Sequence, residues 1–208
     1  MDFLTLRRVV VFGIPAYLVG LFIVYHQDVI PQEIEHYFPY LFSMVALIIV
    51  LRAFTERRFV RMSWLLVIMT HFWIALAVAF NERFSFDQIH IYLSGIAIAG
   101  SIGFLMIQLL RNQEGRLDLN MFHGHSYKHP KFAILFLLCC LGISGFPISP
   151  TFIGEDLIFT HVHEDQPVLA FVIALCFIID GLAITRIYAR VFLGPHVKSV
   201  YEMAYRSS

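Results

Sequence analysis

Charged side chains are scarce in this sequence, and their scarcity limits what the protein can be. Lys, Arg, Asp and Glu make up 14% of the 208 residues, whereas a soluble domain usually carries about a quarter. Hydrophobic residues reach 59%, with a mean hydropathy of +0.74. So little polar surface cannot cover a globule in water, and the composition therefore predicts a protein of the lipid bilayer. The formal net charge is zero, so nothing favours nucleic-acid binding.

Cysteines and processing signals are also sparse. The three cysteines, Cys139, Cys140 and Cys176, all lie within apolar runs, which is typical of small buried side chains. They form neither a disulfide framework nor a CxxC pair. Arg7 and Arg8 precede an apolar run, but that run is long and no small-residue cleavage site follows it. We interpret it as a retained first membrane span.

What the sequence does contain is a series of apolar stretches long enough to cross a bilayer, which takes about 20 helical residues. The six stretches are Val9–Tyr25, Tyr37–Ala53, Ser63–Phe80, Ile89–Leu110, Phe132–Thr160 and Pro167–Leu193. No heptad run or internal repeat accompanies them. The sequence therefore predicts an all-α polytopic membrane protein with six transmembrane helices in a single domain, residues 1–208.

The basic residues predict the orientation, because cytoplasmic connections carry an excess of Lys and Arg. They gather before the first span, in the second and fourth connections, and in the tail. These residues are Arg7, Arg8, Arg52, Arg57, Arg58, Arg61, Arg111, Arg116, Lys128, Lys131, Lys198 and Arg206. The other connections are acidic or mixed. They contain Asp28, Glu33, Glu35, Glu82, Arg83, Asp87, Glu164 and Asp165. The alternation fits six spans with both termini in the cytoplasm.

The fifth stretch is too long for one straight helix. Its 29 residues would extend roughly 43 Å, against a hydrocarbon core about 30 Å thick. It also contains Gly145, Pro147 and Pro150, and proline removes helical hydrogen bonds. We therefore predict a helix that is broken in the middle of the membrane, with Thr151 opening its second half. Broken helices of this kind commonly form ion sites in transporters.

An adjacent pair of carboxylates, Glu155 and Asp156, follows the break. The two side chains point about 100° apart on a helix, so they cannot face the same neighbour. Glu155 is predicted to face the bundle interior about one turn inside the second half-helix, where the helix dipole would favour its ionised form. Asp156 would face a polar cavity or cap a neighbouring group. The alternative is that both lie at the outer water interface and cap the helix.

Two further ionisable residues lie within spans. Asp180 is in the middle of the sixth span, where it would be either a proton-relay group or an interhelical hydrogen-bonding group. His71 is central in the third span, where its ordinary pKa near 6.5 suits proton transfer, although a packing role is the alternative. The fourth span, with Gly95, Gly100 and Gly103, is interpreted as a packing face without a titratable group.

The remaining histidines do not predict a metal or haem site. Two groups of them lie in connections on opposite sides of the predicted topology. They are His123, His125 and His129 on one side and His161 and His163 on the other. Zinc usually needs three or four convergent ligands, and a b-type haem would need a second mid-membrane histidine beside His71. We therefore predict no metal and no cofactor.

The segment from Lys131 through GISGFPISPTFIGEDLIF, followed by a span ending in ITRIYARVFLG, resembles a known family. It is similar to the C-terminal broken helix and following helix of the antiporter-like subunits of respiratory complex I, Mrp antiporters, membrane hydrogenases and inorganic-carbon uptake complexes. The family segment reads like GLPG-x-x-GF-x-G-E/K-F/D. The resemblance places Glu155 where members have a membrane-embedded lysine or glutamate, and Arg190 on the arginine that closes the next helix.

Upstream, the chain departs from the family pattern. The preceding family helix reads H-L-x-x-H-A-x-x-K-A-x-L-F-L, and its two histidines and lysine fall on Tyr92, Ile96 and Gly100. The axial lysine is thus absent. Family members have about 14 helices in two inverted repeats, so the resemblance covers only their C-terminal half.

The resemblance implies a small, split subunit of a proton-conducting module in a larger energy-coupling complex of a bacterial inner membrane. Its partners would be membrane subunits that complete the two-repeat path, and a soluble or peripheral enzyme subunit. At most, the chain would be part of a proton-coupled translocase or oxidoreductase, with no catalytic site of its own. The alternative is a degenerate scaffold subunit that docks or seals a partner without conducting ions. An independent small-solute transporter is a third hypothesis, for which no substrate motif is present.

Overall fold

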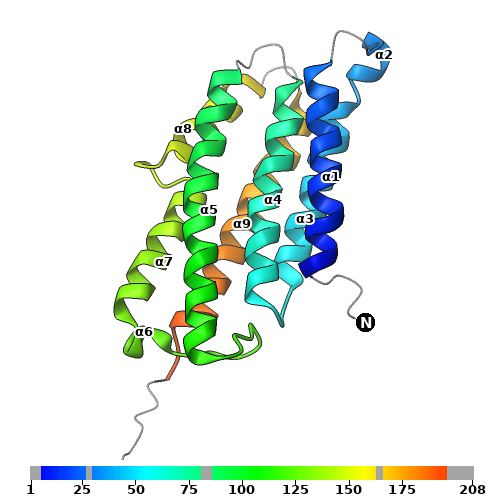
Figure 1. Ribbon diagram of the computed structural model, residues 1–208. Helices are drawn as coiled ribbons and strands as arrows, with labels where there is room; N and C mark the ends of the chain where they lie inside the picture. The colour runs from blue at the N-terminus through cyan, green and yellow to red at the C-terminus, as the bar shows by residue number, and fades with distance from the viewer. Residues whose placement is uncertain (1–5, 27–29, 81–85, 163–165, 196–208) are drawn as a thin grey trace, which may run out of the picture.

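The computed structural model describes residues 6–26, 30–80, 86–162 and 166–195, and all regular structure within these ranges is helical. The prediction of an all-α protein is confirmed. The helices are α1 (Leu6–Tyr25), α2 (Gln32–Glu35), α3 (Phe38–Thr55), α4 (Val60–Ala79), α5 (Phe86–Glu114), α6 (His125–Lys128), α7 (Pro130–Ile143), α8 (Pro150–Val162) and α9 (Pro167–Phe192). The long helices run side by side as a bundle, while α2 and α6 are single turns at its two ends (Figure 1).

Four of these helices, α3, α4, α5 and α9, are long and apolar enough to cross a membrane. Residues 11–25 of α1 and helix α7 are shorter apolar helices. The six predicted stretches correspond to α1, α3, α4, α5, the pair α7 and α8, and α9. The chain is thus a multi-pass membrane protein, whereas the number of six crossings stays a prediction.

Helix α4 lies at the centre of the bundle. Of its most apolar window, 72% of the residues are buried, compared with 33% in α3, α5 and α9. It packs against α1, α3, α5 and α9. The outer faces of the other helices carry exposed large apolar side chains such as Ile48, Ile98 and Ile178. An apolar outer surface around a buried central helix is what contact with lipid requires.

The fifth predicted stretch forms two separate helices. Helix α7 ends at Ile143, and α8 begins at Pro150, one residue before the predicted start. Gly145 has a φ of +66°, a left-handed conformation that glycine adopts without a steric penalty. The hydroxyl of Ser149 accepts a hydrogen bond from the backbone N–H of Phe152 at 3.3 Å, which caps the start of α8. Proline at the first helical position is compatible with this start.

The basic connections lie together at one end of the bundle. The start of α1, the turn between α3 and α4, helix α6 and the end of α9 share the lower end in Figure 1. We call this the basic end, because Arg57, Arg58 and Arg111 lie there. Seven of the residues used for the orientation lie outside the described ranges, as does His163. The seven are Asp28, Glu82, Arg83, Glu164, Asp165, Lys198 and Arg206.

Candidate functional site

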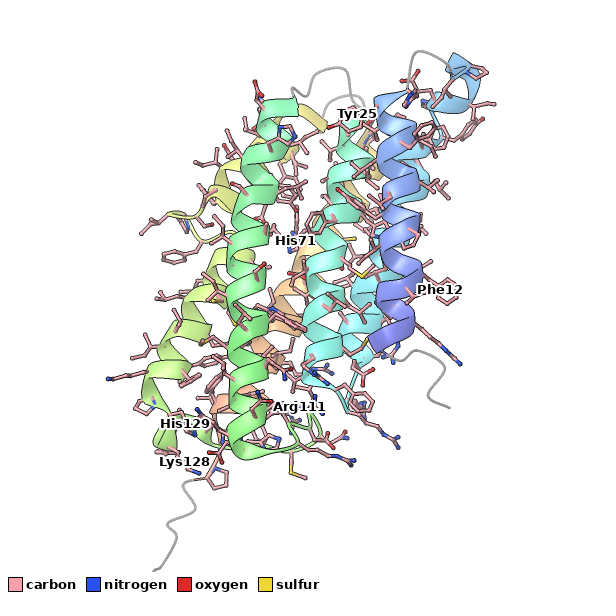
Figure 2. All side chains as sticks on the ribbon, viewed as in Figure 1. Phe12, Tyr25, His71, Arg111, Lys128 and His129 are labelled. Carbon is pink, nitrogen blue, oxygen red and sulfur yellow. The ribbon has the colours of Figure 1, made fainter. Side chains whose placement is uncertain are left out.

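Three buried polar side chains from three helices form one hydrogen-bonded cluster inside the bundle. His71 of α4 lies between Tyr92 of α5 and Asp180 of α9. Its Nδ1 is 2.7 Å from the Tyr92 hydroxyl, and its Nε2 is 3.1 Å from Asp180 Oδ2. None of the three residues is more than 1% exposed. We call this group the buried triad, and Figure 2 labels His71 near mid-height of the bundle.

The geometry of the buried triad assigns the hydrogens when Asp180 is ionised. A carboxylate only accepts, so His71 donates through Nε2–H. The unprotonated Nδ1 then accepts a hydrogen bond from the Tyr92 hydroxyl. Asp180 Oδ1 has no hydrogen-bond partner among the described residues, nor does the nearby buried hydroxyl of Thr151. Buried oxygens of this kind are binding points for water, so the triad can be extended by hydrogen-bonded solvent.

Glu155 lies close to this cluster on α8, and its carboxylate is near enough to Tyr92, His71 and Asp180 to interact with all three electrostatically. The carboxylate also lies against the backbone of Gly145, where an added Cβ would collide with it. Glu155 thus connects the helix break to the bundle interior. It is the sixth residue of α8, beyond the first turn in which a helix dipole acts most strongly. The predicted dipole stabilisation therefore contributes little here.

Asp156 is placed differently from its neighbour. Its side chain is exposed, whereas Glu155 is partly buried, as expected for adjacent residues about 100° apart on a helix. The backbone carbonyl of Asp156 accepts a hydrogen bond from the hydroxyl of Thr160. The structure thus brings His71, Asp180 and Glu155 together and leaves Asp156 outside the cluster.

Close approach of α8 to α5 holds Glu155 in this position. Gly95 of α5 contacts Thr151, and Gly154 of α8 contacts Tyr92, so that an added Cβ at either glycine would collide. Small residues allow such close contact between membrane helices. The prediction that the fourth span is a packing face agrees with these contacts. The prediction that it holds no titratable group is wrong, because Tyr92 belongs to the buried triad.

Sequence reasoning missed Tyr92 because an aromatic residue in an apolar stretch is most often a packing residue. One signal was available: Tyr92 and Ile96 are spaced for one helix face, and they fall on the family's two axial histidine positions. A hydroxyl on that face, rather than a purely apolar ring, is the feature that could have identified it.

Towards the basic end, the interior is filled by aromatic side chains instead. Trp64, Phe136 and Phe192 are buried, and their rings contact one another in series at tilted angles, with centroids 4.8 Å apart for the first pair and 5.4 Å for the second. The indole N–H of Trp64 donates to the carbonyl of Gly100 at 2.9 Å. We call these three rings the aromatic plug. On α4, Trp64 lies seven residues before His71, on the side of the basic end. Polar groups also lie in this half, because Ser63 and Arg186 both donate to the carbonyl of Ala53.

Two further sequence predictions, on a metal site and on Arg190, can be compared with the structure. Within the described ranges, no group of three or more His, Cys, Asp or Glu residues is arranged to hold a metal ion. Arg190, at the end of α9, lies over the ring of Phe122 at 4.2 Å and donates to the carbonyl of Asn120. It therefore joins α9 to the segment between α5 and α7, residues 115–129, which we call the connector. Arg190 lies outside the cluster.

The comparisons with known proteins converge on one family. The model of the NADH:quinone oxidoreductase/Mrp antiporter transmembrane family matches residues 68–179. That range includes His71, Tyr92 and Glu155 and ends one residue before Asp180.

Curated relatives are similar over parts of the chain. NADH-ubiquinone oxidoreductase chain 4 of Dictyostelium citrinum is 32% identical over 102 residues, which are 49% of this chain and 25% of the relative. NADH-quinone oxidoreductase subunit M of Rickettsia prowazekii is 30% identical over 117 residues, 53% of this chain and 24% of the relative. Subunit N of Cytophaga hutchinsonii is 28% identical over 75 residues, 36% of this chain and 16% of the relative. The chain spans about a quarter or less of these relatives.

Proposed function

We propose that this chain, which belongs to the NADH:quinone oxidoreductase/Mrp antiporter transmembrane family, is a subunit of a proton-conducting membrane module in a larger energy-coupling complex. The relatives are named as subunits of NADH-quinone or NADH-ubiquinone oxidoreductases, which supports assembly with other membrane subunits. Its membrane would be the inner membrane of a bacterium, with the basic end facing the cytoplasm. A peripheral enzyme subunit would supply the energy that drives the protons.

The buried triad is the observation that carries this proposal. Ionisable groups inside a membrane are costly, so they are usually kept for function. Here a histidine bridges a carboxylate and a phenol through both of its ring nitrogens, at 3.1 Å and 2.7 Å. Such a bridge can pass a proton across the ring. A proton that binds Nδ1 creates an imidazolium, the Nε2 proton then moves to Asp180 Oδ2, and His71 is left neutral in the other tautomer.

Glu155 would feed this relay from the end of the bundle opposite the basic end. Helix α7 and helix α8 would be the two halves of one discontinuous fifth span, with the break at Gly145, Pro147 and Pro150 inside the membrane. Irregular backbone at that depth must line protein or water, and Glu155 lies against it. We infer six crossings in total, in a single domain over residues 1–208. Asp156 would have no part in conduction.

The aromatic plug supports the participation of other membrane subunits. Trp64, Phe136 and Phe192 occupy part of the interior on the basic-end side of the buried triad. A proton on Asp180 would avoid these apolar rings and leave towards polar groups of a neighbouring subunit, because charge transfer through apolar side chains is unfavourable. The chain would thus contribute one half of a path.

A second function is favoured by the same plug. Ile96 and Gly100 occupy the remaining axial positions, and Trp64 packs against Gly100. A subunit without the axial lysine and with a closed inner half could instead dock or seal a conducting partner. Under this alternative the buried triad would only hold α4, α5 and α9 together.

Paired substitutions in the assembled complex separate the two functions. Glu155→Gln and Asp180→Asn would remove a titratable group with little change in volume, and Asp156→Asn is the matched control on the exposed face. In everted membrane vesicles, with a pH-sensitive dye, we expect the first two variants to lose proton translocation at least about tenfold, because the relay is interrupted. Assembly on a native gel should be unchanged.

Full proton translocation in both variants would contradict conduction and leave the scaffold function. Translocation that follows the sodium gradient, with no acidification when sodium is absent, would contradict the proton as the transported ion. An equal loss in Asp156→Asn would show that the effect is not specific to the cluster.

A further inference from the structure

A pocket at the basic end brings four arginines together. Its volume is about 400 Å³. It lies at the start of α4 and the end of α5, beside the α3–α4 turn and the connector after α5. Arg58, Arg61, Arg111 and Arg116 line it, with Asp118 as its one acidic residue. Figure 2 labels Arg111 at this end of the bundle. None of these residues takes part in the buried triad.

The charge in this pocket is not balanced by the chain's own lining. Arg58 has an interaction of its own, so three guanidinium groups stand against one carboxylate, 3 − 1 = +2. Asp118 Oδ1 already accepts a hydrogen bond from the backbone of Asn120 at 2.8 Å. Arg61 donates to the amide oxygen of Gln108 at 2.8 Å, a neutral partner. Arg111 and Arg116 have no hydrogen bond or ion pair within the described part of the chain. Guanidinium groups gathered in this way repel one another unless an anion is bound between them.

Three other cations at the same end, in contrast, pair with acids of this chain. Arg52 pairs with the buried Glu56 at 2.6 Å. Lys128 and His129 both lie 2.7 Å from one oxygen of Glu114.

The surroundings of the pocket point to a lipid as the source of the anion. Phe59, which is 55% exposed, and Ile107 give the pocket an apolar side next to the guanidinium groups. Arg61 and Arg111 lie at the ends of two helices that are long and apolar enough to cross a membrane, where lipid headgroups would be within reach. The planar fork of arginine fits phosphate oxygens in a bidentate manner, and basic pockets on the cytoplasmic side bind anionic headgroups.

We propose that this pocket binds the phosphate of an anionic phospholipid of the cytoplasmic leaflet. The phosphate lies between Arg61 and Arg111, Arg116 closes over it from the connector, and the glycerol and upper acyl chains rest on Phe59. Such a lipid links α4, α5 and the connector beside the Arg61–Gln108 hydrogen bond, which joins the two helices at this end.

Lipid retention in native mass spectrometry tests the proposal. The full-length chain, within its complex in mild detergent, is titrated with dioleoyl-phosphatidylglycerol and, separately, with dioleoyl-phosphatidylcholine. We expect selective retention of phosphatidylglycerol. The double substitution Arg61→Gln with Arg111→Gln should weaken it roughly 30-fold, since each arginine near an anionic lipid contributes roughly fivefold. Arg57→Gln is the matched control, because Arg57 is an exposed arginine of the same turn and does not line the pocket.

Three outcomes would overturn the proposal. The first is equal retention of both lipids, or equal weakening by Arg57→Gln. The second is displacement of phosphatidylglycerol by inorganic phosphate at similar concentration, which would identify a site for a soluble anion. The third is no lipid binding together with loss of a partner subunit in the double variant, which would identify an acidic partner segment. If the double variant does not fold, the single substitution Arg116→Gln on the exposed connector should still weaken retention roughly fivefold.

Discussion

The two halves of the bundle interior are built from different side chains. The half away from the basic end contains Tyr92, His71 and Asp180, joined by hydrogen bonds across three helices. The half towards the basic end contains Trp64, Phe136 and Phe192, joined by ring contacts. Both halves are almost completely buried, so the difference between them lies in chemistry and not in access to solvent.

This contrast indicates how a short chain can combine stability with an ionisable interior. Large buried rings contribute most to packing free energy, whereas buried polar groups are costly unless every partner is in place. The plug therefore stabilises the contacts among α4, α7 and α9 that hold the triad in register. Substitutions in the two halves should have separable effects, on stability in one and on conduction in the other.

The largest effect on stability is expected for Trp64→Ala in the plug. The substitution removes a fully buried side chain and its hydrogen bond to Gly100. We expect a loss of roughly 3–5 kcal/mol in the free energy of unfolding, as for other buried aromatic residues. Denaturant unfolding in detergent measures it. Phe12→Ala on the exposed face of α1 is the control and should change stability little, since Phe12 is 71% exposed (Figure 2). Similar losses in both variants would remove the distinction between plug and surface.

A smaller effect is expected for Gly145→Ala at the helix break. The left-handed φ of +66° costs roughly 1–3 kcal/mol with any other residue, and the new Cβ would push the Glu155 carboxylate away. Gly115→Ala is a close control, because Gly115 has a φ of +84° but open space around it. Both variants should lose stability in thermal unfolding, and only Gly145→Ala should also lose proton translocation. Equal translocation in the two variants would show that Glu155 need not lie at the break.

Tyr92→Phe removes a single oxygen atom from the buried triad and so tests the polar half of the interior. Removal of the hydroxyl leaves His71 Nδ1 without its donor, which should cost about 1–2 kcal/mol in the free energy of unfolding. Tyr17→Phe is the control, because the Tyr17 ring packs on Phe72 and its hydroxyl has no hydrogen bond within the described ranges. Chemical denaturation of both variants, read by the same probe, gives the comparison. If Tyr92→Phe is no less stable than Tyr17→Phe, the hydrogen bond to His71 does not contribute.

The smallest effect is expected from the connector, which lies outside both halves. Burial and the neighbouring His123, which stacks on His125 at 5.2 Å, lower the pKa of His125 below its ordinary value near 6.5. As the pH falls, His125 therefore takes up its proton in the unfolded chain before it does so in the folded protein. The free energy of unfolding should fall as the pH drops below about 6.5 and on through the lower pKa of the folded state. His125→Gln should flatten this part of a stability-against-pH curve, while His26→Gln, on an exposed site, should not. A curve unchanged by His125→Gln would assign the pH dependence to other groups.

Local features of this architecture could be predicted from the sequence, because each depends on neighbouring residues. Apolar runs indicated the long helices, and Gly145 with Pro150 indicated the separation of α7 from α8. The angle between adjacent helical residues indicated that Glu155 and Asp156 would face differently. The resemblance of the segment around Glu155 correctly pointed to the family.

Features that depend on packing between distant segments could not be predicted. His71 and Asp180 are 109 residues apart, and only the packing of α4 against α9 brings them together. Tyr92 enters the cluster because α5 packs against α4, which brings its hydroxyl to His71. The plug needs three rings from three helices at one depth. No periodicity within a single helix contains that information.

The activity of His71→Gln in the assembled complex tests the central claim most directly. Glutamine can keep a hydrogen bond to Asp180 or Tyr92, but it cannot carry a proton at physiological pH. With assembly intact on a native gel, we predict that proton translocation in everted vesicles falls at least about tenfold. Translocation at the unaltered rate in a fully assembled complex would contradict the claim that the buried triad conducts protons.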